Sequence, residues 1–143
     1  MKIKLTVVVV IVASLLFACG SKKESEPPKS CLESIPEAIS GLKISGARPE
    51  KNVIANLWPT ICRARELYAQ RMKENPKLGK GMIELKITVD FNGEIEAYSI
   101  ARSTLDDPAF DQKVLRVFEF MDFDPYGPHN AETQILLPIR FKP

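Results

Sequence analysis

The stretch from Gly81 to Arg102 limits the possible fold more than any other part of this sequence. Over its first half, large apolar residues alternate with polar ones, the apolar positions being Ile83, Leu85, Ile87 and Val89. A period of two predicts a strand with one buried face and one face in water. Asn92-Gly93 follows, a dipeptide typical of a type I′ turn, in which both central residues take positive φ. We therefore expect a β-hairpin.

A hairpin of this size needs other elements to cover its apolar face. Burying the four side chains would contribute about 6–12 kcal/mol as an upper bound, which is too little to fold a hairpin alone. A helix within residues 50–74 can supply one cover, because apolar residues recur every three or four positions, at Ile54, Trp58, Ile61, Leu67 or Tyr68, and Met72. Pro59 either begins this helix or kinks it, and Asn75-Pro76 ends it.

A second helix and a last strand follow the hairpin. Asp107-Pro108 has the composition of an N-cap and a first-turn proline. The helix that they begin has an apolar stripe at Phe110, Val114, Val117 and Phe118. Residues 121–130 are rich in turn residues and form a connection. We expect the last strand over residues 133–141.

This order of helix, strand, strand, helix and strand predicts an α+β fold. A crossover through the second helix returns the last strand parallel to the hairpin's second strand, so the sheet stays antiparallel only if the hairpin's first strand lies between them. Pro138 supports this arrangement, since a residue without an N–H is tolerated at a sheet edge. We expect a three-stranded antiparallel sheet with two main helices on one face.

The first 18 residues have the pattern of a secretory signal. Lys2 and Lys4 precede an apolar run that is too short for a comfortable membrane span. The run ends in Leu16-Phe17-Ala18-Cys19, which resembles the lipobox of bacterial lipoproteins. The resemblance implies that Cys19 is lipidated and becomes the N-terminus, and that Gly20 directs sorting to the outer membrane, facing the periplasm. The alternative is an ordinary signal peptide that ends near a cysteine.

The chain after the signal divides into three parts. Residues 19–30 are polar and contain a Pro-Pro pair, so we expect a lipidated, flexible tether. Residues 31–52 mix apolar residues with Pro36 and Gly41, which predicts an irregular cover segment. Residues 53–143 would form one small domain. Removing the signal takes two of the 20 basic residues, so 18 basic residues balance 18 acidic ones, which argues against nucleic acid as a partner.

Two cysteines remain once Cys19 is lipidated, and they are Cys31 and Cys62. In an oxidising envelope compartment, two such cysteines suggest a disulfide. The bond would pin the cover segment to the long helix. The alternative is two unpaired, buried thiols.

No set of residues points to catalysis. His129 is the one histidine, and no cluster at metal-ligand spacing surrounds it. The carboxylate pairs Asp106-Asp107 and Asp122/Asp124 are explained by a helix start and a turn. No nucleophile elbow and no Gly-rich phosphate loop occur. We therefore expect no enzyme activity, no metal, no cofactor and no small-molecule substrate.

A set of positions in the second half of the chain resembles the AgmX/PglI C-terminal domain family, which belongs to the wider TonB C-terminal group. These positions are Tyr68, Asn75-Pro76, Leu78, Gly81, Gly93, Ser103-Thr104-Leu105, Asp107-Pro108, Phe123, Pro138 and Phe141. Many relatives carry a pair of cysteines where this chain has Leu67 and Lys113. The resemblance implies a TonB-like fold and binding of a protein, whereas energy transduction is not implied, because the transmembrane anchor and long Pro-rich segment of the transducers are missing.

The resemblance points to the last strand as the place where a protein of the cell envelope would bind. An extended segment of the partner would pair with the sheet edge along Ile135, Leu136, Leu137, Ile139 and Phe141. Alternatively, Pro138 protects this edge against unwanted pairing. A different function, binding of a non-protein component such as cell-wall glycan, would use the exposed hairpin face with Lys86, Tyr98 and Arg102.

Overall fold

Residues 30–143 are described by the computed structural model, and the predicted signal, Cys19 and nearly all of the tether lie outside these residues. Within the described part, the chain forms two α-helices, four strands and two short 3₁₀ turns. In chain order they are η1 (Cys31–Glu33), β1 (Lys43–Gly46), α1 (Glu50–Glu74), η2 (Pro76–Leu78), β2 (Gly81–Val89), β3 (Ile95–Ser103), α2 (Pro108–Glu119) and β4 (Thr133–Phe141).

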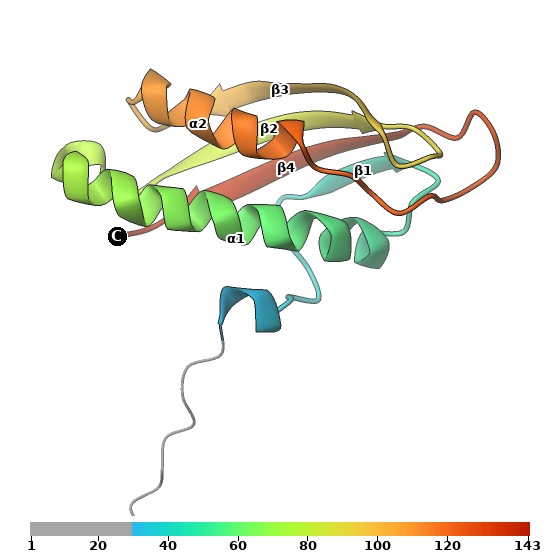
Figure 1. The fold of residues 1–143 in the computed structure, drawn as a ribbon, viewed down its shortest axis with the longest axis horizontal. Coiled ribbons are helices and arrows are strands. Elements are labelled where there is room, and N and C mark those ends of the chain that lie inside the picture. The colour runs from blue at the N-terminus through green and yellow to red at the C-terminus, as the bar shows by residue number, and fades with distance from the viewer. Residues whose placement is uncertain (1–29) are drawn as a thin grey trace, which may run out of the picture.

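The elements form two layers, with α1 and α2 packed on one face of an antiparallel sheet (Figure 1). The strand order is β1-β4-β2-β3. The α+β class, the two helices and the central place of the hairpin's first strand are therefore confirmed. The prediction of three strands is wrong, because β1 pairs with β4. This four-residue strand carries a single large apolar residue, Ile44, so no alternating pattern marks it in the sequence.

The register of β2 explains its apolar alternation. Ile83, Leu85, Ile87 and Val89 are all buried, with at most 1% of each residue exposed. The first three lie directly opposite core residues of β4, in the pairs Ile83–Ile139, Leu85–Leu137 and Ile87–Ile135. Opposite residues of an antiparallel pair point to the same face, so one face of the sheet becomes continuously apolar beneath the helices.

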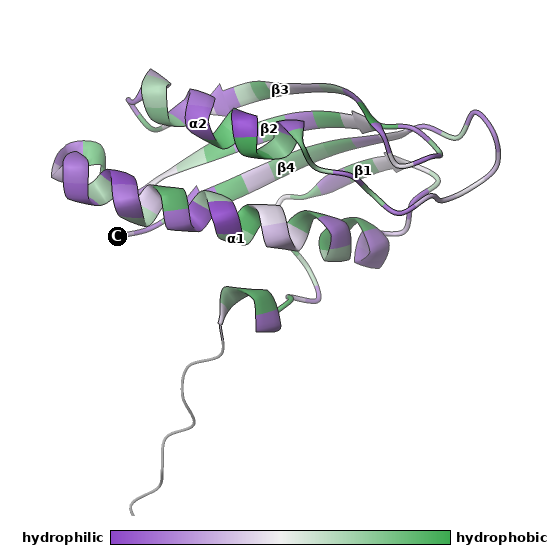
Figure 2. Cartoon of the chain, in the orientation of Figure 1, coloured by the Kyte–Doolittle hydropathy of each residue, from purple (hydrophilic) through white to green (hydrophobic). Residues whose placement is uncertain are grey.

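Both helices lie close to their expected bounds. Apolar and polar residues follow one another along each helix (Figure 2). The apolar ones share the side that packs on the sheet. In α1, Tyr68 is the buried member of the Leu67/Tyr68 pair, and its ring lies 5.1 Å from that of Phe141 and 6.0 Å from that of Phe110. The helix continues through Pro59, which is exposed. Water can there hydrogen bond the carbonyl that a proline leaves unbonded.

The hairpin turn differs from the predicted type I′ turn. Gly93 has a φ of 93°, but Asn92 does not have a positive φ. The N–H of Gly93 donates to the carbonyl of Asp90 (3.2 Å), and the N–H of Phe123 donates to the carbonyl of Gly93 (2.9 Å). A Cβ atom on Gly93 would lie 1.8 Å from the Phe123 carbonyl oxygen. The turn is shaped by its contact with the α2–β4 connection, which the local sequence does not reveal.

Arg48 is a buried charge that joins three segments. It is 3% exposed, and its guanidinium donates to the carbonyls of Asp90 and Asp124 and to the side chain of Asn52. The same group lies 5.2 Å from the centre of the Phe123 ring. Desolvation by burial lowers the pKa of Arg48 below its usual value, while the nearby carboxylates of Asp90 and Asp124 oppose the shift. Arg48 thus holds the hairpin turn and the α2–β4 connection to the start of α1.

Asp107 joins the two helices as well as beginning α2. Its carboxylate accepts from the backbone N–H of Phe110 (3.0 Å), as expected of an N-cap. It also accepts from Arg71 of α1, at 2.7 Å and 3.2 Å. The hydrogen bonds from Arg71 hold the pKa of Asp107 below its usual value, although burial acts in the opposite direction.

We predict that Asp107→Ala lowers the free energy of unfolding by at least about 1 kcal/mol, because the N-cap is lost. Asp107→Asn keeps an oxygen acceptor for Phe110 but replaces the oxygen that accepts from the Nε–H of Arg71 with an NH2 donor, so it breaks the ion pair and keeps the N-cap. Since the folded-state pKa lies below that of the unfolded chain, the charge stabilises the fold above the unfolded value near 3.8 and loses its effect as the pH falls below that value. Urea unfolding at several pH values measures both effects.

The matched control is Asp106→Asn, at the exposed neighbouring carboxylate. The Asp107→Asn deficit should be present at neutral pH and shrink in acid. A deficit that is constant over the whole pH range would contradict the role assigned to the ion pair.

Candidate functional site

The predicted binding edge on β4 is only partly free. β1 pairs with its first half, from Thr133 opposite Gly46 to Leu136 opposite Lys43. The prediction that Ile135 and Leu136 belong to an edge strand is therefore wrong. The neighbouring strand arises from the segment expected to be an irregular cover, and it occupies the first half of the edge that a three-stranded sheet would leave open.

Beyond Leu136, β4 has no strand on its outer side in residues 30–143. Pro138 lies just past the last pair with β1. Its ring lies beside Gly41, where an added Cβ atom would be 3.2 Å from the proline Cγ. This position agrees with the expectation that Pro138 lies at a sheet edge, because a proline has no N–H to donate to a neighbouring strand. Residues 139–141 form the rest of the free edge.

The hydrogen-bond alternation shows which backbone groups of this edge point outward. Met82 bonds to Thr104 through both its N–H and its C=O, so these groups point toward β3. Its partner on β4 is Arg140, which therefore forms a non-hydrogen-bonded pair with Met82. The N–H and C=O of Arg140 consequently point away from β2, toward the open edge.

Of the predicted site residues, only Phe141 contributes to the lining of the groove described below. Ile135, Leu137, Ile139 and Phe141 are buried in the core, with at most 2% of each exposed. Leu136 points to the other face of the sheet and is half-buried. The other residues that surround the free edge come from α1 and from the C-terminal end of the chain around Arg140 and Lys142, and no pattern in the sequence marked them.

A groove of about 680 Å³ lies beside the free edge, between the second half of α1 and the end of β4. Tyr68, Ala69, Met72 and Phe141 contribute its apolar part. Its remaining lining residues are Arg65, Arg140, Lys142 and Pro143. The groove therefore combines an apolar floor with three cationic side chains and no acidic one. An extended segment with an apolar and an acidic side chain fits this chemistry.

Tyr68 is fixed at the base of the groove. Its hydroxyl donates to the carbonyl of Gly79, and burial raises its pKa above the usual value. The phenol therefore stays neutral at physiological pH. Tyr68 contributes a rigid apolar wall to the groove rather than a reactive group.

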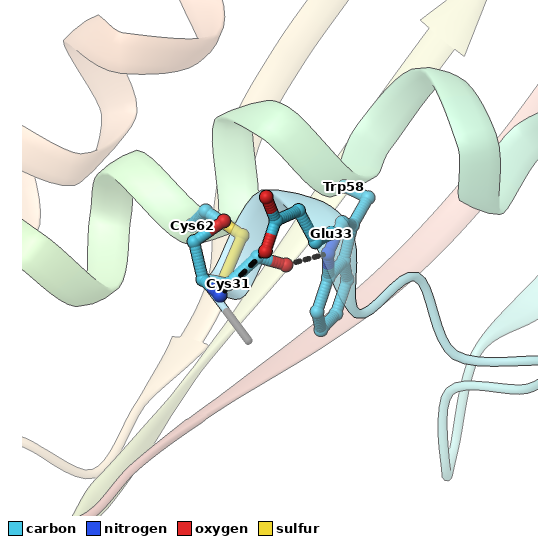
Figure 3. The surroundings of a disulfide bond; sticks show 5 residues. Cys31, Glu33, Trp58 and Cys62 are labelled. Carbon is cyan, nitrogen blue, oxygen red and sulfur yellow. Dashed lines mark hydrogen bonds between the residues drawn. A yellow bond between two sulfur atoms is a disulfide. The ribbon is translucent and has the colours of Figure 1, made fainter. Parts of the chain in front are cut away.

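The predicted disulfide between Cys31 and Cys62 is present and holds η1 against α1 (Figure 3). Trp58 supports the same contact, because its indole N–H donates to the carbonyl of Cys31 (2.6 Å). The guanidinium of Arg65 lies 5.0 Å from the centre of the Trp58 ring. The chain between the disulfide and β1 passes the β4 edge at Pro138, which sets the boundary of the free part.

The second predicted surface, on the hairpin, is divided between the two faces of the sheet. Lys86 and Arg102 lie on the open face, but Tyr98 pairs with Ile87 and points toward the helices. A β-bulge between the pairs Glu84–Arg102 and Leu85–Ile100 causes the change, because an extra residue reverses the alternation along β3. The grouping of Tyr98 with Lys86 and Arg102 is therefore wrong.

The remaining candidate groups are dispersed. Within residues 30–143, no three His, Cys, Asp or Glu side chains lie close enough together to hold a metal ion. His129 is exposed, and its ring lies 4.4 Å from that of Phe91. Asp107 is occupied by the helix cap and by Arg71.

We predict that replacing both Cys31 and Cys62 with alanine lowers the free energy of unfolding by about 3–4 kcal/mol, because the bond closes a loop with a sequence separation of 31 residues. Guanidinium unfolding of the oxidised protein and of the double variant measures the loss. Dithiothreitol should destabilise the original protein and leave the double variant unchanged. Equal unfolding midpoints for the two proteins would refute the stabilising role.

None of the helices in the described part of the chain has the length and apolar character needed to cross a membrane. No protein-family model matches the chain, and no curated protein or solved structure is significantly similar to it.

Proposed function

We propose that this protein is a membrane-tethered, non-catalytic lipoprotein of the cell envelope that binds an envelope protein by strand pairing at the free end of β4. One observation carries the proposal: an outward-facing peptide group at Arg140 lies directly beside the apolar groove of Tyr68, Met72 and Phe141. Backbone bonds along the edge would supply affinity, and the groove would select a side chain.

The partner segment would run along residues 139–142 beneath the second half of α1. Its side chains would alternate, with an apolar one in the groove and an acidic one near Arg65 or Lys142. The TonB-like fold and the AgmX/PglI likeness, which rest on the residues given above, favour the same mode of binding.

The tether and the anchor belong to the same proposal. Lipidation at Cys19, after removal of residues 1–18, would hold the domain at the outer membrane, facing the periplasm. Several acyl chains at roughly 0.8 kcal/mol per buried CH₂ give a stable anchor. The polar residues up to Ser30 would let the domain reach partners close to that membrane.

Photo-crosslinking in living cells tests the binding site. A photoreactive residue at Met72 or Lys142 should give one discrete protein adduct, because both positions line the groove, whereas the same residue at Lys86 on the open face should not. Ile135 and Leu137 are unsuitable positions, since both side chains are buried. Adducts from Lys86 alone would overturn the proposed site.

A matched pair of variants tests strand pairing itself. Arg140→Pro removes an outward N–H and leaves the bonds between β4 and β2 intact, whereas Arg140→Ala removes the charge and keeps the N–H. We expect Arg140→Pro to weaken partner capture about tenfold or more, and Arg140→Ala to weaken it less. Thermal unfolding shows that each variant is folded. Equal capture by both variants would argue against main-chain pairing.

Binding of cell-wall glycan is the second candidate function. A shallow hollow of about 360 Å³ on the open side of the sheet is lined by residues that include Lys43, Lys86 and Gln134, whose polar groups suit hydroxyl-rich or anionic polymers. Retention of the protein on isolated cell wall, lost in Lys86→Glu, would support it. Retention that Lys86→Glu leaves unchanged would count against this surface.

A further inference from the structure

The outer edge of β3 is the longest unpaired strand edge in the described part of the chain. β3 runs from Ile95 to Ser103 at the end of the sheet and pairs only with β2. In β2, the N–H and C=O groups of every second residue point toward β3. Met82 is one of these residues, and so are Lys86 and Thr88, whose partners on β3 are Ser99 and Ala97. The peptide groups of Tyr98 and Ile100 therefore point outward, away from the sheet.

We propose that two copies of this chain associate through β3, with the two strands antiparallel about a two-fold axis at Ser99. Ser99 then faces Ser99 of the second copy, and Tyr98 lies opposite Ile100 of the second copy. Since the peptide groups of Tyr98 and Ile100 both point outward, this register gives each strand the hydrogen bonds that an antiparallel pair requires. An aromatic residue opposite a β-branched one is also a favourable cross-strand pair.

Charge complementarity supports this register. With the axis at Ser99, Glu96 of each copy and Arg102 of the other lie at the two ends of the regularly paired segment, where their long side chains would meet as two ion pairs. Both residues are exposed, and neither forms a salt bridge within residues 30–143. A register centred on Tyr98 or on Ile100 would instead place Glu96 opposite Ile100 or Arg102 opposite Tyr98.

The side chains along this edge are suited to a protein contact. Tyr98 and Ile100 point to the helix side of the sheet and pack against the core, but each side chain is only half-buried. Leu115 is also half-buried and lies one helical turn after Asp111, whose side chain accepts from Ser103. A second copy would cover these three apolar side chains, each of which is partly exposed to water in the single chain.

The bulges of β3 set the extent of the contact. They lie at Glu96 and Ala101, because pairing with β2 shifts register at both points. Regular pairing is thus restricted to a few residues around Ser99, and the two α2 helices begin at opposite ends of the paired strands. The resulting sheet ends in β1 on both sides, where a four-residue strand offers little for further growth. The assembly therefore closes as a dimer.

Charge-swap variants test the register. The single variants Glu96→Arg and Arg102→Glu each place like charges opposite one another twice, so each should associate on the order of tenfold to a hundredfold more weakly than the original chain. A one-to-one mixture of the two single variants forms complementary pairs in the mixed dimer, and the double variant restores them in its own dimer. Both should regain the original affinity.

Sedimentation equilibrium of the full chain, in detergent matched to the solvent density, measures the association. Lys73→Glu, on the exposed side of α1, is the control for net charge and should leave the affinity unchanged. A monomer at the highest attainable concentration overturns the proposal, as does equal association of all variants. Failure of the mixture to regain affinity would also overturn it, because the assigned register requires that recovery.

Discussion

The antiparallel register between β2 and β4 is the constraint on which the rest of the structure depends. It places three pairs of branched aliphatic residues opposite one another in the centre of the sheet, each at most 2% exposed. A slip of one residue would carry all of them to the open face. The crossover through α2 serves this register, because it returns the chain to the far side of β2, and Asp107 fixes the start of α2 against Arg71 of α1.

The same register decides which parts of the molecule can meet another protein. Odd residues of β4 are committed to the core and to β2, whereas Arg140 directs its peptide group outward. On the opposite edge, Tyr98 and Ile100 direct theirs outward from β3. The two proposed contacts therefore lie at opposite edges of one sheet and use different strands. Pairing of two copies at β3 leaves both β4 grooves accessible.

Local patterns in the sequence predicted the elements well and their lateral arrangement less well. The alternation at Ile83 to Val89, the Asp107-Pro108 start and the Asn75-Pro76 end each depend on neighbouring residues, and each was confirmed. Strand β1 and the turn at Gly93 depend on contacts with distant segments, β4 and Phe123. The side of the sheet on which Tyr98 lies depends on a bulge, which alternation alone cannot locate.

The candidate groove was beyond sequence reasoning for a related reason. Its lining comes from α1 around Tyr68 and from the end of β4 around Phe141, two segments far apart in the chain. Each contributes residues that look ordinary in their own segment. The cysteine pair, in contrast, was predicted, because cysteine chemistry in an oxidising compartment restricts the possibilities without any knowledge of the fold.

The position of the disulfide has a mechanical consequence. Residues 32–61, with β1 among them, lie inside the covalent loop that Cys31 and Cys62 close. Tension applied at Ser30 therefore passes through the sulfur–sulfur bond directly into the middle of α1, and β1 carries none of it. From α1 the load continues to the groove through Tyr68, whose ring packs against Phe141. A domain pulled between its N-terminal attachment and a ligand in the groove would keep β1 in place under force.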